Sequence, residues 1–350
     1  MKKKMAVSRK KKIFRWFLLI GTLTSFFFVP WIVVRLWLSP LPATVQGQVD
    51  KAQDYGFEGM IVYVDQQGQK PMSYASGWMN REDKVPTDPN ALFKIASIGK
   101  LYQAVSIAQL VAQDKIDLDN SIGFYFPELI GKIEHADKIT VRMLVQHRSG
   151  IPNYTNTPNF WNEPVNTDDE KIALIFNQPA NFTPGTDYEY CNTNYALLGK
   201  LTEKVTPAGG MQWVKEKILK PLDLKNTHFS IHDVDMNRVM GGYYVGIEED
   251  IKYTDYSSML ATAEDVGIFL RALNDGTLLT PKELEIYASI YEFEHTGLIP
   301  GYQSMAKYYK DIDAVVIQFT NTTDFNGYHW NVSQVLQHRI VKIIRKSTKD

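Results

Sequence analysis

The sequence predicts an α+β fold in which one antiparallel sheet takes strands from both ends of the main body, with flanking helices and a mainly helical region inserted between the two groups of strands. Strand patterns occur early, at 59–64 and 72–78, and return late, at 304–309 and 314–320. Helical patches and loops dominate 115–285 between them. Strands at both ends around a helical middle favour a single mixed domain.

The flanking elements follow from local patterns. The residues Gln66-Gln67-Gly68 can turn the chain between the first two strands, which predicts a hairpin. Apolar residues spaced three and four apart predict a helix that begins near Ser97, a second over 194–204 and a third over 332–345. The last of these is amphipathic and closes the body.

The amino-terminal region predicts a membrane anchor. Eight Lys and Arg residues precede an apolar run at 17–34, whose eighteen residues would extend about 27 Å as a helix, close to the thickness of a bilayer core. We therefore expect a basic cytoplasmic tail at 1–15, a transmembrane signal anchor at 16–38, a linker at 39–50 and one domain at 51–350. The basic flank predicts a single-pass protein of the cell membrane whose carboxyl-terminal domain is extracytoplasmic.

Two other interpretations of the apolar run are open. A cleaved signal peptide would have a shorter apolar region and a small-residue cleavage site, which Leu41-Pro42-Ala43 matches poorly. A buried helix of a soluble protein is disfavoured by the basic flank. Pro30 can kink a membrane helix without preventing its insertion.

The distribution of charge argues against nucleic acid as a partner. Residues 1–38 hold nine basic side chains and no acidic one, whereas the remainder holds 29 basic and 39 acidic side chains, a net charge of −10. Phosphate binding needs a basic surface, which this acidic body lacks. Cys191 is the only cysteine, so no intrachain disulfide can form.

The first segment with chemical potential is Ser97-Ile98-Gly99-Lys100, at the predicted start of a helix. Residues at positions i and i+3 share a helix face, so Lys100 can reach Ser97. A serine hydroxyl needs a nearby base and a site for the developing oxyanion, and a desolvated lysine can accept its proton. The alternative is that Ser97 only caps the helix while Lys100 is solvated.

Three further segments carry polar groups suited to acyl chemistry. Tyr190-x-Asn192 precedes a predicted helix, where a phenol can relay protons and an amide can hold a carbonyl. His295-Thr296-Gly297 lies just before the last strands, and His147 lies between the first two motifs. Each of these is weak alone, because a Tyr-x-Asn pair and a lone histidine are more often structural.

Together and in this order, the segments resemble the serine β-lactamase and penicillin-binding-protein superfamily, most closely class C β-lactamases with their D,D-peptidase and esterase relatives. The resemblance covers about 55–325. The matching segments are FKIASIGK at 93–100, LVQHRSG at 144–150, YCN at 190–192, PLDL at 221–224 with Thr227, LATAED at 260–265 and HTG at 295–297.

The resemblance implies a role for each matching residue. Ser97 would attack a carbonyl and form an acyl-enzyme, with Lys100 and Tyr190 sharing the proton transfer. Asn192 would orient the substrate amide. The substrate would lie along the strand that carries His295, Thr296 and Gly297, and the backbone N–H groups of Ser97 and Leu298 would form the oxyanion hole. The resemblance implies no metal and no organic cofactor.

Three departures from the family pattern matter. The third motif usually begins with Lys, which helps to bind a substrate carboxylate, whereas His295 is mostly neutral near pH 7 if its pKa is unperturbed. This favours esters or other acyl donors over substrates with a carboxylate. Cys191 replaces a common Ser and is interpreted as a small buried residue rather than a second nucleophile. Only about 30 residues separate Asp265 from His295, so the cleft is more open there or the sheet has lost a strand.

The leading hypothesis is thus a membrane-anchored extracytoplasmic serine hydrolase that acts on cell-wall D-alanyl peptides or esters, or on related acyl donors. One alternative is a β-lactamase, with β-lactams as ligands. The other is a penicillin-binding or sensing module of the same fold that turns over slowly.

Overall fold

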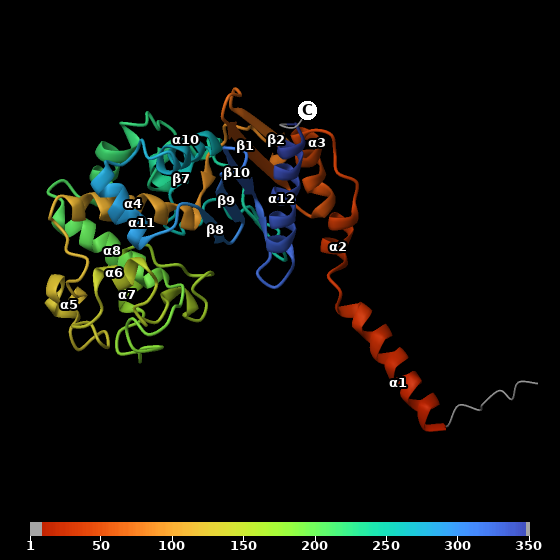
Figure 1. The fold of residues 1–350 in the computed structure, drawn as a ribbon, viewed down its shortest axis with the longest axis horizontal. Helices are drawn as coiled ribbons and strands as arrows, with labels where there is room; N and C mark the ends of the chain where they lie inside the picture. The colour runs from red at the N-terminus through yellow and green to blue at the C-terminus, as the bar shows by residue number, and fades with distance from the viewer. Residues whose placement is uncertain (1–8, 348–350) are drawn as a thin grey trace, which may run out of the picture. The chain divides into compact units, whose positions relative to one another are not determined.

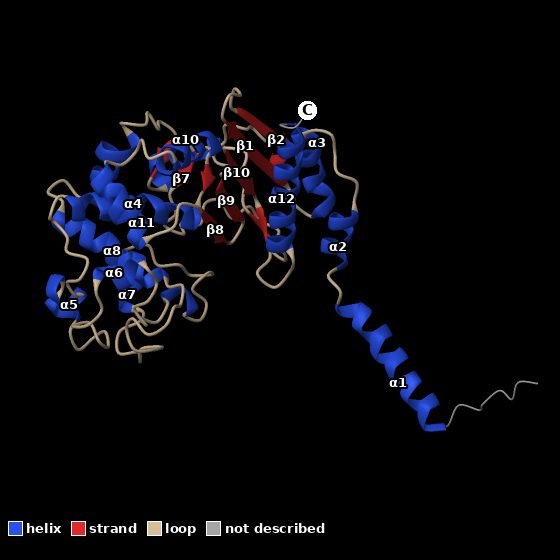
Figure 2. Ribbon diagram, in the orientation of Figure 1, coloured by secondary structure: helices blue, strands red, loops and turns tan. Residues whose placement is uncertain are grey.

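The computed structural model describes residues 9–347 and divides into two compact units, which meet in sequence between Pro40 and Leu41. Residues 1–8 of the predicted cytoplasmic tail and the last three residues of the predicted domain lie outside the described residues. Figure 1 traces the chain in order, and Figure 2 separates its helices from its strands.

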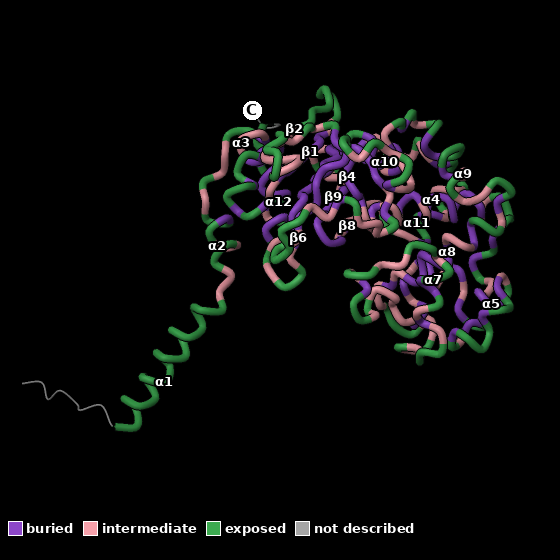
Figure 3. The backbone as a smooth tube through the Cα atoms, turned by 180° about the vertical axis from the view of Figure 1, so that it is seen from behind, coloured by how far each residue is buried: buried purple, intermediate pink, exposed green. Residues whose placement is uncertain are grey.

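The amino-terminal unit consists of α1 (Arg9–Ser25), a short 3₁₀ turn (Phe26–Phe28) and α2 (Trp31–Leu38). Every side chain of α1 is exposed (Figure 3). No single helix among residues 9–347 is both long and apolar enough to span a membrane, but α1 with its turn and α2 pass together as a pair bent by 79°. The predicted span is therefore interrupted, since Pro30 lacks the N–H that a continuous helix needs.

The second unit contains ten helices and eleven strands within the described residues. The helices are α3 (Val45–Val49), α4 (Gly99–Ala112), α5 (Ile122–Tyr125), α6 (Val141–Val145), α7 (Asp168–Ala173), α8 (Asn192–Val205), α9 (Gly210–Val214), α10 (Ala263–Asn274), α11 (Pro281–Ile290) and α12 (His329–Ser347). The strands are β1 (Gly59–Gln66), β2 (Met72–Asn80), β3 (Val85–Pro86), β4 (Phe93–Lys94), β5 (Thr227–His228), β6 (Tyr243–Tyr244), β7 (Leu260–Ala261), β8 (His295–Ile299), β9 (Tyr302–Tyr309), β10 (Ala314–Thr320) and β11 (Thr322–Thr323).

The main sheet joins the two ends of this unit. Its six strands follow the order β3-β2-β1-β10-β9-β8, and each neighbouring pair is antiparallel. Strand β1 pairs with β10 in a register that places Met60 opposite Thr320. The predicted sheet with strands from both ends is confirmed. Between Asp265 and His295 the chain forms the rest of α10 and then α11, without a strand.

Helices cover both faces of the sheet. Helices α3 and α12 pack together on one face, and α10 packs against β1, β9 and β10 on the other (Figures 1 and 2). The predicted helical insertion is confirmed, because α4 to α11 all lie between β3 and β8 in the chain. Covered on both sides, the apolar residues at 60–64 of β1 are all buried.

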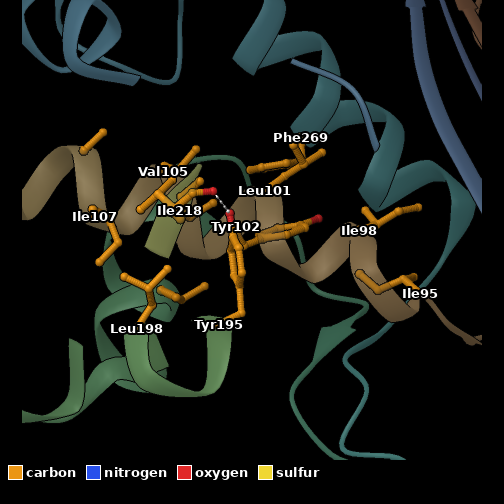
Figure 4. Close-up of a cluster of buried hydrophobic side chains, with 14 of the residues drawn as sticks. Ile95, Ile98, Leu101, Tyr102, Val105, Ile107, Tyr195, Leu198, Ile218 and Phe269 are labelled. Atoms are coloured by element: carbon orange, nitrogen blue, oxygen red, sulfur yellow. Dashed lines mark hydrogen bonds between the residues drawn. The ribbon is translucent and has the colours of Figure 1, made fainter. Parts of the chain in front are cut away.

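The helical insertion is joined to the sheet layer through α4 and α10. The ring of Tyr102 on α4 stacks on that of Phe269 on α10, with centroids 3.8 Å apart and planes at 12°. Ile98, Leu101 and Val105 extend the same buried face along α4 (Figure 4). This face holds α4, and with it the preceding turn that contains Ser97, against the sheet layer.

Replacing Phe269 with Ala tests this contact. The change removes a fully buried ring, so the free energy of unfolding should fall by about 3–5 kcal/mol. Urea denaturation measures the change. Phe124→Ala is the control, because Phe124 is 65% exposed, and it should cost about 0.5 kcal/mol or less. Equal losses in the two variants would contradict the packing described here.

Candidate active site

Ser97 lies in a tight turn between a short strand and a helix. Strand β4 leads into a 3₁₀ turn (Ala96–Ile98), and α4 begins two residues after the serine. Ala96 has φ +51°, a left-handed conformation that costs a residue with a Cβ free energy. Two hydrogen bonds hold it: the N–H of Ala96 donates to Ser258 Oγ at 2.9 Å, and the N–H of Ile95 donates to the Met259 carbonyl at 2.9 Å.

Strand β8 packs directly against this turn. A Cβ added at Gly297 would lie 2.4 Å from the Ile95 carbonyl oxygen and 2.3 Å from Ser304 Oγ, so only glycine allows the approach. Ser304 Oγ in turn donates to the Ile95 carbonyl at 2.8 Å. The close contact places the backbone of Leu298 beside the turn that carries Ser97, as the proposed oxyanion hole requires.

Lys100 connects the nucleophile turn to α8. Its Nζ lies 3.2 Å from Ser97 Oγ and donates to Asn192 Oδ1 at 2.8 Å. The i, i+3 spacing brings the first pair together along one helix face, as predicted. The second contact joins residues 92 positions apart. The structure thus gathers Ser97, Lys100 and Asn192 in one cluster.

Asn192 is held in place by residues that the sequence did not single out. Its backbone N–H donates to Asn153 Oδ1 at 3.1 Å, and its Nδ2 donates to Thr155 Oγ1 at 3.3 Å. Because Nδ2 is the donor, Oδ1 is left for Lys100. Asn153 lies shortly after Gly150, in a segment whose apolar residues show neither helical nor strand periodicity. The sequence pattern therefore gave no sign of its contact with Asn192.

Tyr190 lies between Lys100 and two histidines. Lys100 Nζ is 5.1 Å from the centroid of the Tyr190 ring, within cation–π range. The His147 ring lies 4.5 Å from the Tyr190 ring, and the His295 ring 6.3 Å, centroid to centroid. The phenol therefore belongs to the same cluster as Ser97 and Lys100.

His295 begins β8, the edge strand of the main sheet, and is partly exposed. Its Nδ1 lies 2.5 Å from the Thr296 carbonyl oxygen, and its ring stacks on Tyr291 at 5.9 Å. Burial, reinforced by the charge of nearby Lys100, lowers the pKa of His295 to about 4. The imidazole is therefore neutral at pH 7.

His147 and Cys191 are buried and make structural contacts with the backbone. His147 is buried with φ +57°, and its Nδ1 accepts the N–H of Cys191 at 3.1 Å. Burial, with a smaller effect of Lys100, lowers the pKa of His147 to about 3. Cys191 is also buried, its Sγ lies 3.3 Å from the Ile151 carbonyl, and burial raises the pKa of the thiol. Its surroundings fit a small buried residue.

Two hollows adjoin the cluster. One of about 770 Å³ is lined by residues of α4, α7 and α8, including Lys100 and Asn192. The other, of about 810 Å³, is lined by Tyr190, His295 and Thr296 together with charged side chains. We call the second hollow the His295 cleft. Lys100 thus borders the first hollow and Tyr190 the second.

Comparison with protein families and sequences gives an independent result. The family model described as Beta-lactamase matches residues 42–289. Protein flp of Staphylococcus aureus strain MW2 is 24% identical over 240 residues, which is 65% of this chain and 48% of that protein. The chain thus spans about half the length of the curated relatives that it matches first.

Solved structures share the fold. D-amino acid amidase from Ochrobactrum anthropi SV3, complexed with D-phenylalanine, superposes with a TM-score of 0.76 at 23% identity, covering 87% of this chain and 98% of that one. A penicillin binding protein from Bacillus halodurans superposes with a TM-score of 0.70 at 19% identity, covering 85% and 98%. At these identities the likeness concerns the fold.

The buried neutral His147 predicts a loss of stability in mild acid. Its folded pKa of about 3 lies below the unfolded value of about 6.5, so the unfolded chain takes up the proton first. The stabilisation is complete above pH 6.5 and is lost as pH falls, by about 2 kcal/mol between pH 7 and pH 5.

Urea denaturation at the two pH values measures this effect, with His147→Asn as the control. Asn tolerates the left-handed backbone at this position and does not titrate. The fall in stability from pH 7 to pH 5 should be about 2 kcal/mol smaller in the variant. An unchanged pH dependence would show that His147 is not held neutral.

Proposed function

The chain belongs to the Beta-lactamase family, and from this premise we propose that it is a serine hydrolase that forms an acyl-enzyme on Ser97. One observation carries the proposal: Lys100 Nζ lies 3.2 Å from Ser97 Oγ while Asn192 holds the same nitrogen from the opposite helix. A nucleophile, a base within hydrogen-bond reach and a third group that orients the base are what acyl transfer requires.

The proposed first step forms the acyl-enzyme. Ser97 Oγ forms a bond to the carbonyl carbon of the substrate, and its proton passes to Lys100 in its amine form. The bond to the leaving nitrogen or oxygen then breaks, and the leaving group takes up the proton held by Lys100, passed on through Tyr190, which returns Lys100 to its amine form. The negative charge on the carbonyl oxygen is stabilised by the backbone N–H groups of Ser97 and Leu298.

The second step releases the acyl group. Water attacks the carbonyl carbon of the ester on Ser97, gives up one proton to the same base and forms a carboxylic acid. Ser97 Oγ leaves and regains its proton. No metal is needed for either step, since proton transfer and oxyanion stabilisation are both supplied by the chain.

The proposed acyl donors are D-alanyl peptides or esters of the cell wall. Support comes from the names of the proteins that share the fold, a D-amino acid amidase and a penicillin binding protein. The neutral His295 favours donors without a carboxylate at the position that Lys serves in the resembling family. D,D-carboxypeptidase and esterase activity are the two forms of this proposal, and the neutral His295 favours the esterase form, because the D-alanine released by a carboxypeptidase ends in a carboxylate.

We also propose that the protein is anchored in the cell membrane with its second unit outside the cytoplasm. Support comes from the bent pair of α1 and α2, whose combined composition passes for a membrane span, and from the basic residues ahead of it. An anchored hydrolase would remain next to a cell-wall substrate.

The nucleophile is tested with a fluorophosphonate probe and intact mass measurement. The wild-type chain should gain one adduct and Ser97→Ala should gain none. Lys100→Ala should react at least about a hundredfold more slowly than the wild type. Ser73→Ala, which removes an exposed serine of β2, is the matched control and should react like the wild type. An adduct that persists in Ser97→Ala would overturn the mechanism.

The anchor is tested by expression in a Gram-positive bacterium. The full chain should sediment with membranes and be digested by protease added to intact protoplasts, whereas a chain that begins at residue 41 should remain soluble. Protection of the full chain from protease would contradict the orientation. A soluble full chain of undiminished mass would contradict the anchor itself.

A further inference from the structure

His295 offers a hydrogen-bond acceptor to the substrate. A carbonyl oxygen can only accept, so the 2.5 Å contact between the Thr296 carbonyl and Nδ1 requires the hydrogen to be on Nδ1. The ring is neutral, because it is largely buried and lies close to Lys100. In a neutral imidazole with the hydrogen on Nδ1, Nε2 carries a lone pair.

The orientation of this ring is fixed by its neighbours. Tyr291 stacks on one side at 5.9 Å with planes at 19°, and the Tyr190 ring lies at 6.3 Å. The contact with Thr296 holds the Nδ1 edge against the strand. Rotation that exchanged the two nitrogens would break the hydrogen bond to Thr296.

The His295 cleft is also lined by charged side chains. Arg148 already donates to the Gly185 carbonyl at 2.8 Å, and Lys307 pairs with Glu294 at 3.5 Å. Glu292 also lines the cleft, and within residues 9–347 it has no ion-pair partner. These side chains contribute both positive and negative charge, so the acceptor at Nε2 makes the distinction: a carboxylate there would meet a lone pair, whereas a hydroxyl or ammonium group would find a partner for its hydrogen.

We propose that His295 Nε2 accepts a hydrogen bond from the leaving group, so that the His295 cleft selects acyl donors whose leaving alcohol or amine carries a hydroxyl or ammonium group, over those whose leaving group ends in a carboxylate. The inference rests on the proposed function, because it names the part of the substrate that departs when Ser97 is acylated. His295 is a specificity-determining residue in this scheme and takes no proton.

The test compares three esters of D-alanine that differ only in the alcohol: 2-hydroxyethyl, propyl and carboxymethyl. The full-length chain hydrolyses each to D-alanine and the free alcohol. We expect kcat/KM to be highest for the hydroxyethyl ester, which gains a hydrogen bond to Nε2. It should be lower by about tenfold for the carboxymethyl ester, which makes an unfavourable contact there. The propyl ester, which has no polar group at this position, should lie between them.

Two variants separate the role of Nε2 from a loss of structure. His295→Lys replaces the acceptor with a cationic donor and should reverse the preference between the hydroxyethyl and carboxymethyl esters. His295→Gln keeps an acceptor oxygen and should retain the wild-type order. Thermal unfolding of both variants is measured alongside, and a changed ratio at an unchanged melting temperature supports the inference.

The protonation of the ring is measured directly by NMR of the full-length chain labelled with ¹⁵N-histidine. At pH 7 the His295 signals, assigned by their absence in His295→Gln, should show hydrogen on Nδ1 alone. Hydrogen on Nε2, or on both nitrogens, would overturn the inference.

The outcomes for the two proposals are distinct. Failure of Ser97 to take up the fluorophosphonate probe would overturn the proposed function itself. A chain whose Ser97 reacts would overturn only the present inference if it prefers the carboxymethyl ester, if it hydrolyses none of the three esters, or if His295→Lys leaves the ratio unchanged.

Discussion

The antiparallel pairing of β1 with β10 is the constraint on which the site depends. It joins residues at 60–66 to residues at 314–320, and β9 and β8 then add to the same edge. Because β8 is thereby placed at the end of the sheet, its Gly297 can press against the turn that carries Ser97. A domain assembled from the two ends of its chain thus needs long-range strand pairing before its candidate site can form.

The helical insertion supplies the opposite wall of the site. Its α4 carries Lys100 and follows directly on the turn that holds Ser97, and its α8 begins at Asn192, so the contacts from serine to lysine to amide join the two helices. The buried stacking of Tyr102 on Phe269 anchors α4 to the sheet layer. The same packing that stabilises the insertion therefore also positions Ser97.

Electrostatics distinguishes this site from the family pattern that it resembles. Where that pattern places a second cation, the chain has a histidine whose pKa is lowered by burial and by Lys100. His147, whose ring also lies close to Tyr190, is held neutral in the same way. Two neutral rings therefore lie beside Tyr190, where the resembling pattern has a cation in place of one of them.

Much of the fold was predictable, because long elements carry periodic patterns. The strands at 59–64, 72–78, 304–309 and 314–320 all lie within observed strands, and the three predicted helices exist with slightly different ends. The two-residue strands β3 to β7 and β11 were not predicted, since two residues show no alternation. The apolar run near the amino terminus is divided in two, because composition shows hydrophobicity but not the break at Pro30.

The sequence by itself determined the residues that can do chemistry, because Ser97 and Lys100 are joined by local helical spacing and the remaining motifs occur in a familiar order. Only the tertiary structure decided what surrounds them. The partners Asn153 and Ser258 come from irregular loops distant in sequence, where no periodicity reports contact. The neutral state of His295 was likewise decided by folding, since burial and a neighbouring charge exist only once distant segments have packed together.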